Sequence, residues 1–264
     1  MAVTRLEIKA RRPFEDGAAF GTAGSYERID GIAHFAVDLS AIAEDEVRAR
    51  TGAELNDLRF FGALLEAEQA GLLAYARAIL HWHAQHRFCG ACGAPTRSEA
   101  AGHVRRCTNA DCAIEHFPRT DPAVIMLVTD PDDRALLARN AAWPGRRVSI
   151  LAGFVDPGES AEQAVIREVA EETQIKVTNV RYVGSQPWPM PRSLMLGFRA
   201  DAPAGQDIVV DREEIAEAYW FSRDELVAAI KAREIALPPP VSIARQIIEQ
   251  WYGAPLPSTW SDRR

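Results

Sequence analysis

The sequence contains no run of about eighteen uncharged apolar residues, which is the length that a membrane-spanning helix requires. Its first residues, MAVTRLEIKARRPF, lack the apolar core of a secretory signal. Internal repeats and low-complexity tracts are also missing. The sequence therefore predicts neither a membrane span nor a secretory leader of the usual kind, and we expect a cytoplasmic protein.

The sequence has fewer basic than acidic residues: 30 lysines and arginines and 37 aspartates and glutamates give a net charge of −7. Such a chain has no global attraction to nucleic acid. The arginine pairs Arg105/Arg106 and Arg146/Arg147 are interpreted as solvated surface groups rather than phosphate sites. With 264 residues, 47% of them apolar, the chain can bury a real core in one or two domains.

Cysteine is scarce, and all four cysteines fall in one short window: Cys89, Cys92, Cys107 and Cys112. Two close thiol pairs at this separation favour a tetrahedral structural zinc site, with Gly90 and Gly93 in the first tight turn. Unliganded thiols or disulfides are the alternatives, and disulfides are unusual without an export signal. The nearby histidines are predicted not to be ligands: His86, His103 and His116.

The stretch from Gly153 to Ile175, GFVDPGESAEQAVIREVAEETQI, carries the strongest functional signal. Ser160 and Gln163 fit the capping box that starts a helix. Five apolar positions are expected to bury most of one face of that helix: Ala161, Ala164, Val165, Ile166 and Val169. The acidic residues Glu168, Glu171 and Glu172 have the spacing that places side chains on one side of a helix. Crowded carboxylates favour a divalent cation such as Mg²⁺ or Mn²⁺, although a solvated acidic helix has a similar composition.

This segment resembles the Nudix box, the defining motif of Nudix hydrolases, through Gly153, Glu159, Arg167, Glu168, Glu171 and Glu172. The resemblance implies catalytic roles for the three helix glutamates, and for Arg167 and Glu159. Arg167 can hold a glutamate by a bidentate contact, while Glu159 joins a second metal or braces the loop. The family usually has glycine where Gln174 stands, so we expect a somewhat different helix exit.

A second motif, SQPWPMPRS, runs from Ser185 to Ser193. Its three prolines predict a stiff, extended loop, which by itself is equally typical of a structural connector. Downstream of a Nudix-like helix it resembles the SQPWPFPxS element of the NADH pyrophosphatase (NudC-like) branch, with Met190 in place of phenylalanine. The resemblance implies substrate-binding roles for Gln186, Pro187, Trp188, Pro189, Met190, Pro191, Arg192 and Ser193.

The resemblance covers about residues 86 to 250 and implies three more site residues. Phe117 stands where a substrate-contacting tyrosine often occurs, and Ala244, in LPPPVSIARQ, matches a position whose backbone meets the substrate. Glu214 matches a further metal-binding glutamate, with Glu213 as the alternative if the register slips by one residue. From the residues alone, the alternative is that Glu213, Glu214 and Glu217 form a surface acid cluster.

The expected architecture is an α/β (α+β) Nudix fold with a mixed sheet sandwiched by helices, preceded by a zinc ribbon and a small N-terminal α+β domain. The expected boundaries are 1–85, 86–118 and 119–254, followed by a tail, 255–264. Residues 63–82 read as a helix and 32–39 as a short strand. Further strands are expected at 123–129, 134–140, 177–188 and 193–201.

By resemblance, the expected reaction is metal-dependent hydrolysis of NADH to NMNH (reduced nicotinamide mononucleotide) and AMP. NAD⁺ and the NAD cap of an RNA 5′ end are further expected substrates, and a homodimer is the expected assembly. The sequence leaves open which glutamate acts as general base. Two alternatives remain: a Nudix hydrolase for ADP-ribose or an oxidised dNTP, and a zinc-ribbon nucleic-acid-binding regulator with an inactive Nudix domain. The proline-tryptophan motif disfavours the first, and the complete set of acids disfavours the second.

Overall fold

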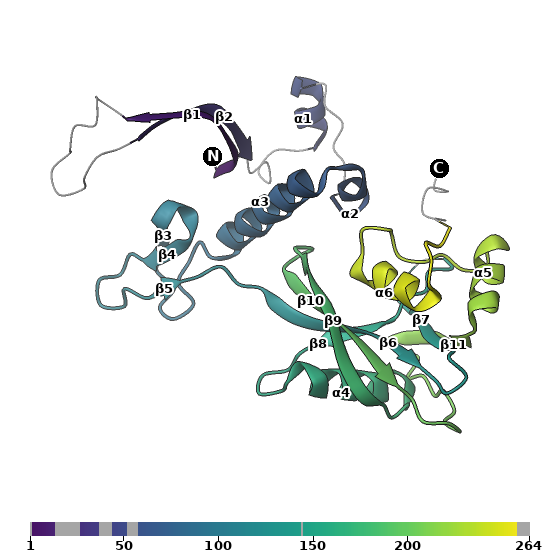
Figure 1. Cartoon of the computed structure of the whole chain (residues 1–264). Helices are drawn as coiled ribbons and strands as arrows, with labels where there is room; N and C mark the ends of the chain where they lie inside the picture. Colours follow the sequence, from purple (N-terminus) through teal and green to yellow (C-terminus); the bar gives the residue numbers. More distant parts are fainter. Residues whose placement is uncertain (1, 14–26, 37–43, 52–57, 144, 258–264) are drawn as a thin grey trace. The chain divides into compact units, whose positions relative to one another are not determined.

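The computed structural model of the chain describes residues 2–13, 27–36, 44–51, 58–143 and 145–257. They belong to two compact units, Met1–Pro118 and Arg119–Arg264 (Figure 1). In the first unit, strands β1 (Ala2–Pro13) and β2 (Glu27–Ala36) form an antiparallel ribbon. The helices that follow are α1 (Glu44–Thr51), α2 (Leu58–Phe61), the short 3₁₀ helix η3 (Gly62–Leu64) and α3 (Ala67–Gln85).

Helix α3 confirms the helix predicted over 63–82, but it begins four residues later. The reason is local: η3 occupies residues 62–64, and Glu66 has the extended backbone of an N-cap residue. Ala76, Ile79 and Trp82 form the buried side of α3. The strand expected at 32–39 is confirmed through residue 36 by β2, and its last three residues lie outside the described part of the chain.

The first unit ends in a small antiparallel sheet of β3 (Thr96–Glu99), β4 (Val104–Cys107) and β5 (Glu115–His116), with a 3₁₀ turn η4 (Ala100–Gly102). Arg105 holds this sheet to the preceding helix end. Its Nε donates to the Thr96 hydroxyl at 2.7 Å and to the His86 carbonyl at 2.8 Å. These bonds fix the strand that carries Cys107 beside the segment that carries Cys89.

The second unit is built on a six-stranded mixed sheet. Its strands are β6 (Asp121–Thr129), β7 (Ala135–Asn140), β8 (Leu151–Phe154), β9 (Thr178–Trp188), β10 (Ser193–Asp201) and β11 (Ile215–Phe221). The order is β11-β7-β6-β10-β9, and β8 pairs with β6. Only β6 and β10 run parallel to each other among these described pairs. The strands expected from the sequence are thereby confirmed.

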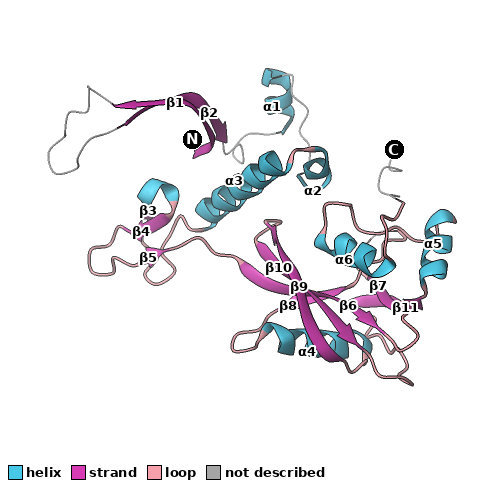
Figure 2. Ribbon diagram, viewed as in Figure 1, coloured by secondary structure: helices cyan, strands magenta, loops and turns pink. Residues whose placement is uncertain are grey.

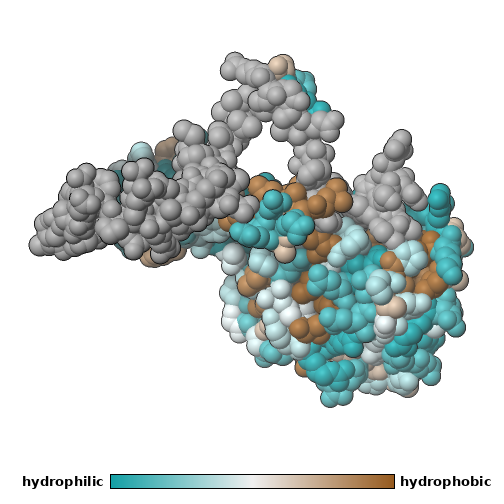
Figure 3. Space-filling view, turned by 45° about the horizontal axis from the view of Figure 1, so that its top comes forward, coloured by the Kyte–Doolittle hydropathy of each residue, from teal (hydrophilic) through white to brown (hydrophobic). Residues whose placement is uncertain are grey.

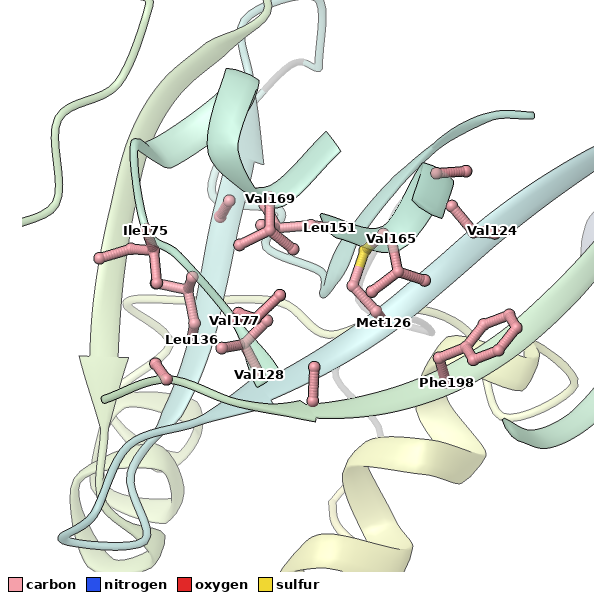
Figure 4. Close-up of a cluster of buried hydrophobic side chains, with 14 of the residues drawn as sticks. Val124, Met126, Val128, Leu136, Leu151, Val165, Val169, Ile175, Val177 and Phe198 are labelled. Atoms are coloured by element: carbon pink, nitrogen blue, oxygen red, sulfur yellow. The ribbon is translucent and has the colours of Figure 1, made fainter. Parts of the chain in front are cut away.

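Strand β6 is apolar on both faces because both faces of the sheet are covered. Val124, Met126 and Val128 belong to a core that includes residues of helix α4 (Ala161–Thr173), drawn in Figure 4. Ile125 and Leu127 belong to a second core with helices α5 (Arg223–Lys231) and α6 (Ile243–Tyr252). Figure 2 shows α4 on one side of the sheet and α6 on the other, which confirms the expected sandwich.

Two details of the acidic helix differ from expectation. Ile166 is 45% exposed rather than buried, because it lies on the solvent side of α4 while Ala164, Val165 and Val169 face the core. Gln174 ends the helix in the left-handed conformation, φ 57° and ψ 12°, as a glycine would. The expected change of helix exit is therefore wrong; glutamine adopts the same exit at a cost of about 1–2 kcal/mol.

The SQPWPMPRS motif is also less of a loop than predicted. Ser185 to Trp188 form the end of strand β9, and only the four residues that follow make the turn into β10. Pro187 pairs opposite Leu194 and is tolerated because β9 lies at the edge of the described sheet. The motif is therefore the tip of a hairpin, which gives its side chains fixed directions.

The surface of the described residues is mixed. On the face drawn in Figure 3, hydrophilic residues cover most of the coloured surface, with separate hydrophobic patches between them. Exposed aromatic residues in the second unit include Phe154, Tyr182 and Tyr219. Among the described helices, none combines the length and the apolar character needed to cross a membrane.

Candidate functional site

Helix α4 presents the predicted acids at its start and along one face. Ser160 caps the helix by accepting from the Gln163 backbone, and Gln163 accepts from the Ser160 backbone, so the predicted capping box is present. Glu172 is buried at 3% exposure, whereas the Glu171 side chain is 61% exposed. The helix therefore holds one buried and one solvent-facing carboxylate next to each other, with Glu168 one turn earlier.

Arg167 is the centre of the carboxylate network. It forms the predicted bidentate contact with Glu159, through Nε at 3.0 Å and a terminal nitrogen at 2.9 Å. It also donates to Glu168 and Glu171, both at 2.9 Å, and to the Phe154 carbonyl at 2.8 Å. The hydrogen bond from Arg167 lowers the pKa of Glu159.

Glu159 is thus engaged on both oxygens, because its second oxygen also accepts from the Asp156 backbone at 3.1 Å. Of the two roles expected for this residue, these contacts favour bracing the loop between β8 and α4.

Glu172 carries the strongest electrostatic signal in the unit. Burial raises its pKa to about 8, and the neighbouring charges of Glu168, Glu214 and Asp211 add to the shift. Burial likewise raises the pKa of Glu168. The buried Oε2 atom of Glu172 has no hydrogen-bond partner. A buried carboxylate oxygen without a donor, surrounded by like charges, is an arrangement that a cation stabilises.

Glu214 reaches this cluster from the segment before β11. Asp211 fixes the turn there, because its Oδ1 accepts from the backbone nitrogens of Glu214 and Ile215, both at 3.1 Å. Glu214 contributes to the raised pKa of both Glu168 and Glu172, and Glu213 is not among the causes. Glu217 is paired with Arg139 at 3.0 Å. The charges near Glu172 thus favour the register that selects Glu214.

Asp211 is a site residue that sequence reasoning missed. It adds charge near Glu172 and shapes the Glu214 turn. The available signal was its position three residues before Glu214, which is typical of an aspartate that caps a turn.

The acids fit a divalent cation by the chemistry of their donors. Hard cations prefer carboxylate oxygens, and the cluster has an excess of them with one unpartnered buried oxygen. Arg167 competes for Glu168 and Glu171, since it is hydrogen-bonded to both. The residues Glu168, Glu171, Glu172 and Glu214 stay predicted ligands on this basis.

A cavity of about 310 Å³ lies on the α6 side of the sheet. Its walls include Gln186 and Trp188 from β9, Met195 from β10, and Ser242 and Ala244 at the start of α6. Three of the predicted substrate residues, Gln186, Trp188 and Ala244, thus share one cavity although they are far apart in the sequence. Its volume is at the lower end for ligand pockets and suits one ring or nucleoside rather than a whole dinucleotide.

Strand β8 connects the cavity to the acids. Ala152 lines the cavity, whereas its neighbour Gly153 lies against the carboxylate of Glu168. Successive residues of a strand face opposite sides of a sheet, so the cavity and the acids lie on the two faces of the same short strand. Phe154, the next residue, is 57% exposed at the end of β8.

Sequence reasoning missed the wall of the cavity that comes from the segment between β7 and β8. Trp143 and Arg147 both line the cavity. Asn140 sets the turn that leads to Trp143, since its carbonyl accepts from the Trp143 backbone at 3.0 Å. Arg147 is half-buried at the cavity while Arg146 is exposed, and the interpretation of both as solvated surface groups stays a prediction. The only available sequence signal was an isolated tryptophan in a polar segment.

The remaining predicted substrate residues do not line this cavity. Pro189 is buried, Met190 is half-buried, and Pro187 and Pro191 are exposed at the hairpin tip. Arg192 pairs with Asp121 at 2.5 Å, and Ser193 begins β10. Phe117 belongs to the first unit, where its ring is 61% exposed. The roles of these residues stay predictions.

The four cysteines of the first unit meet as predicted. Their sulfur atoms all lie within 4.8 Å of one another, with 3.8 Å between Cys89 and Cys112 and 3.4 Å between Cys92 and Cys107. Tetrahedral zinc with Zn–S bonds of about 2.3 Å requires sulfurs about 3.8 Å apart, so the set fits a zinc ion. No disulfide joins these cysteines. Gly93 has φ +75°, as the tight turn requires.

Two of the three histidines near the zinc set have contacts elsewhere, and that none of them is a ligand stays a prediction. His86 Nδ1 lies 2.9 Å from the Trp82 carbonyl, and His103 Nε2 lies 2.9 Å from the Tyr75 hydroxyl. His116 helps lower the pKa of the Cys89 thiol, after the backbone groups of Ala91 and Cys92, and its own buried Nε2 has no hydrogen-bond partner.

Family models match three consecutive parts of the chain. They are an NADH pyrophosphatase-like rudimentary NUDIX domain over residues 15–82, an NADH pyrophosphatase zinc ribbon domain over 84–117 and a NUDIX domain over 119–239. Among solved structures, a NUDIX hydrolase from Nitrosomonas europaea is 23% identical with a TM-score of 0.49, covering 64% of this chain and 95% of that one.

Curated proteins are more similar. The NAD-capped RNA hydrolase NudC of Mycobacterium bovis (strain BCG / Pasteur 1173P2) is 47% identical over 221 residues, which cover 81% of this chain and 69% of that protein. The NAD-capped RNA hydrolase NUDT12 of Homo sapiens is 40% identical over 243 residues, covering 85% of this chain and 51% of that protein. This identity, together with the zinc ribbon and Nudix matches, shows that the chain belongs to the NADH pyrophosphatase (NudC-like) family of Nudix hydrolases.

Proposed function

We propose that this chain hydrolyses the pyrophosphate bond of NADH, giving NMNH and AMP, and that it also cleaves NAD⁺ and the NAD cap of RNA. The observation that carries the proposal is the arrangement around β8. A cavity for one ring opens at Ala152, and the carboxylate cluster begins at the neighbouring Gly153. A dinucleotide joins a ring to a diphosphate, and we propose that it reaches both regions by passing around the exposed end of β8 at Phe154. The names of the M. bovis and human relatives agree with this substrate class.

The carboxylates would hold Mg²⁺ or Mn²⁺ through Glu168, Glu171 and Glu172, with Glu214 approaching from the segment before β11. Bound there, such a cation neutralises charge on the phosphoryl oxygens and acidifies water. The protein supplies the rest by positioning, which is the main requirement of phosphoryl transfer. Arg167 fixes Glu159 and the Phe154 carbonyl, and so holds the loop between β8 and α4 in place.

The cavity residues bind and orient the substrate. Trp188 and Trp143 supply indole rings on two different segments of the cavity wall, and Met195 adds an apolar contact. A nucleobase or nicotinamide ring held between such walls brings the diphosphate to the acids. The chain thus has a binding region and a reaction region linked by one strand.

Product analysis tests this function. The purified chain is incubated with NADH, NAD⁺, NAD-capped RNA, ADP-ribose and an oxidised dNTP at matched concentration, with Mg²⁺ or Mn²⁺. We expect NMNH and AMP from NADH, and loss of about two or more decades of rate in Glu172→Gln, because that change removes a ligand charge at nearly constant volume. Faster turnover of ADP-ribose or the dNTP than of all three NAD compounds would contradict the proposal.

Three further properties are proposed with it. We propose a homodimer that acts in the cytoplasm, and segments 1–85, 86–118, 119–254 and 255–264 as the functional divisions of the chain. Light scattering that gives the 29.1 kDa mass of one chain at micromolar concentration would contradict the dimer. Cell fractionation and limited proteolysis test the location and the divisions.

A further inference from the structure

We propose that Gln186 is a positioning residue that holds two walls of the cavity at a fixed separation, a role that rests on the proposed function. Its side-chain Nε2 donates to the Val241 carbonyl at 2.7 Å, and its Oε1 accepts from the Ile243 backbone nitrogen at 2.8 Å. The two partners are backbone groups of one segment, more than fifty residues from Gln186 in the sequence. One primary amide thereby joins the end of β9 to the start of α6.

The orientation of the amide follows from these partners. A backbone carbonyl can only accept and a backbone N–H can only donate, so the NH₂ group must face Val241 and the oxygen must face Ile243. Each end keeps a second position, one N–H and one lone pair, so the two backbone bonds fix the amide without preventing a further contact. These bonds give Gln186 a role in shaping the site, and its contact with the substrate stays a prediction.

Leu237 and Ile243 are buried in the core, but between them the segment that Gln186 holds has few other backbone hydrogen bonds. Pro238, Pro239 and Pro240 have no backbone N–H and cannot pair with a strand. Within the segment, the Ser242 backbone donates to the Pro239 carbonyl, and the Ser242 hydroxyl caps α6. Pro238 and Pro239 line the cavity, so a shift of this segment changes the width of the cavity directly.

Gln186 also positions the cavity wall that contains Trp188, opposite the proline segment. Trp188 follows Gln186 by two positions on β9, and residues two apart in a strand face the same side. Both line the cavity. Gln186 thus lies at the junction of the tryptophan wall and the proline wall, and its two hydrogen bonds set the distance between them. A flat ring stacks well only at one separation, so the amide controls ring binding without touching the reacting atoms.

Two variants and a control test the proposal. Gln186→Met keeps the length of the side chain and removes both hydrogen bonds. Gln186→Glu keeps an oxygen for the Ile243 N–H but turns its second carboxylate oxygen toward the Val241 carbonyl, so two acceptors repel each other there. Gln246→Met, on the exposed side of α6 and away from the cavity, is the matched control.

The measurements are KM and kcat for NADH, the melting temperature, and the dissociation constants of AMP and NMN by calorimetry. We expect Gln186→Met to raise the KM by about tenfold to a hundredfold, as a misplacement of about 1 Å does. The value of kcat should stay within about threefold, because the acids are unchanged. One mononucleotide, the one whose ring enters the cavity, should bind more weakly while the other is unaffected. Gln186→Glu should raise the KM at least as much as Gln186→Met, because it adds repulsion at the Val241 carbonyl.

An unchanged KM in Gln186→Met would overturn the proposal. So would equal weakening of both mononucleotides together with a lowered melting temperature, since Gln186 would then only brace the fold. Binding of AMP and NMN requires no turnover. A wild-type chain that binds a mononucleotide in a Gln186-dependent way but leaves NADH intact would therefore overturn the proposed function and leave the positioning role supported.

Discussion

Gly153 of strand β8 packs directly against the carboxylate of Glu168 on helix α4, and a β-carbon on Gly153 would overlap the carboxyl group. Gly153 does not have a positive φ angle, so glycine is required by this close approach and not by the backbone conformation. The absence of a side chain lets a strand and an acidic helix approach closely enough to place Glu168 at the edge of the sheet.

We therefore predict that Gly153→Ala displaces the Glu168 carboxylate and lowers the rate of NADH hydrolysis by about two decades. The melting temperature should change little, because the overlapping atoms are the end of a flexible side chain. Steady-state kinetics and thermal melts measure the two effects. Gly184→Ala, on strand β9, is the control, since a β-carbon there meets no atom within 4 Å. Wild-type turnover in Gly153→Ala would mean that the position of Glu168 is not critical.

The raised pKa of Glu172 predicts a pH-dependent stability in metal-free protein. The folded state keeps the proton of Glu172 up to about pH 8, whereas the unfolded chain loses it near 4.5. Between these values the folded state binds more protons, so the contribution of Glu172 to stability falls as the pH rises.

We expect wild type and Glu172→Gln to be similarly stable near pH 4.5, and the variant to be the more stable of the two at pH 8. Denaturant unfolding of both proteins across this range, with chelator present, measures the difference in their free energies of unfolding. The contributions of the other titrating groups are the same in both proteins and cancel in this difference. Added Mg²⁺ should then stabilise wild type more than the variant, because the cation needs the deprotonated carboxylate. A difference in free energy that does not change with pH would contradict the burial of an ionisable Glu172.

The cysteine set predicts about one zinc ion per chain by elemental analysis, because four converged thiols form one closed tetrahedral site. Cys107→Ser should lower the melting temperature of the zinc-loaded protein by about 5–10 °C, which corresponds to a few kcal/mol in a chain of this size. Molecules that remain folded should keep most of their kcat, since a closed site leaves no position for substrate. Ser98→Ala, exposed on the neighbouring strand β3, is the control. Zinc-free protein of full stability would contradict the assignment.

The two tryptophans of the cavity predict a common effect on ring binding. Trp188→Ala and Trp143→Ala should each raise the KM for NADH, with a loss of about 1–3 kcal/mol if ring stacking dominates. The effect on an oxidised dNTP should differ from the effect on NADH, and the melting temperature should be nearly unchanged. Met190→Phe restores the residue usual in the family and should strengthen NADH binding or leave it unchanged. Equal losses on every substrate with a lowered melting temperature would show that these tryptophans are scaffold residues.

Local spacing in the sequence determined the parts of the site that lie within one element. Glu168 and Glu172 share a helix face because an α-helix repeats every 3.6 residues, and Ser160 and Gln163 start that helix by contacts within one turn. The cysteine pairs likewise predicted a metal site because each pair lies in one tight turn. These features depend only on contacts between residues that are close in the sequence, so the order of residues is enough to predict them.

Only the tertiary structure decided which distant segments meet. The overlap of Gly153 with Glu168, the approach of Glu214 and Asp211 to Glu172, and the amide of Gln186 bound to Val241 and Ile243 all depend on how strands and helices pack. Trp143 lines the cavity because of the same packing of distant segments. Each of these contacts results from burying two apolar cores on opposite faces of one sheet, and hydrophobic burial is not directional. A spacing rule therefore cannot specify which polar groups that burial brings together.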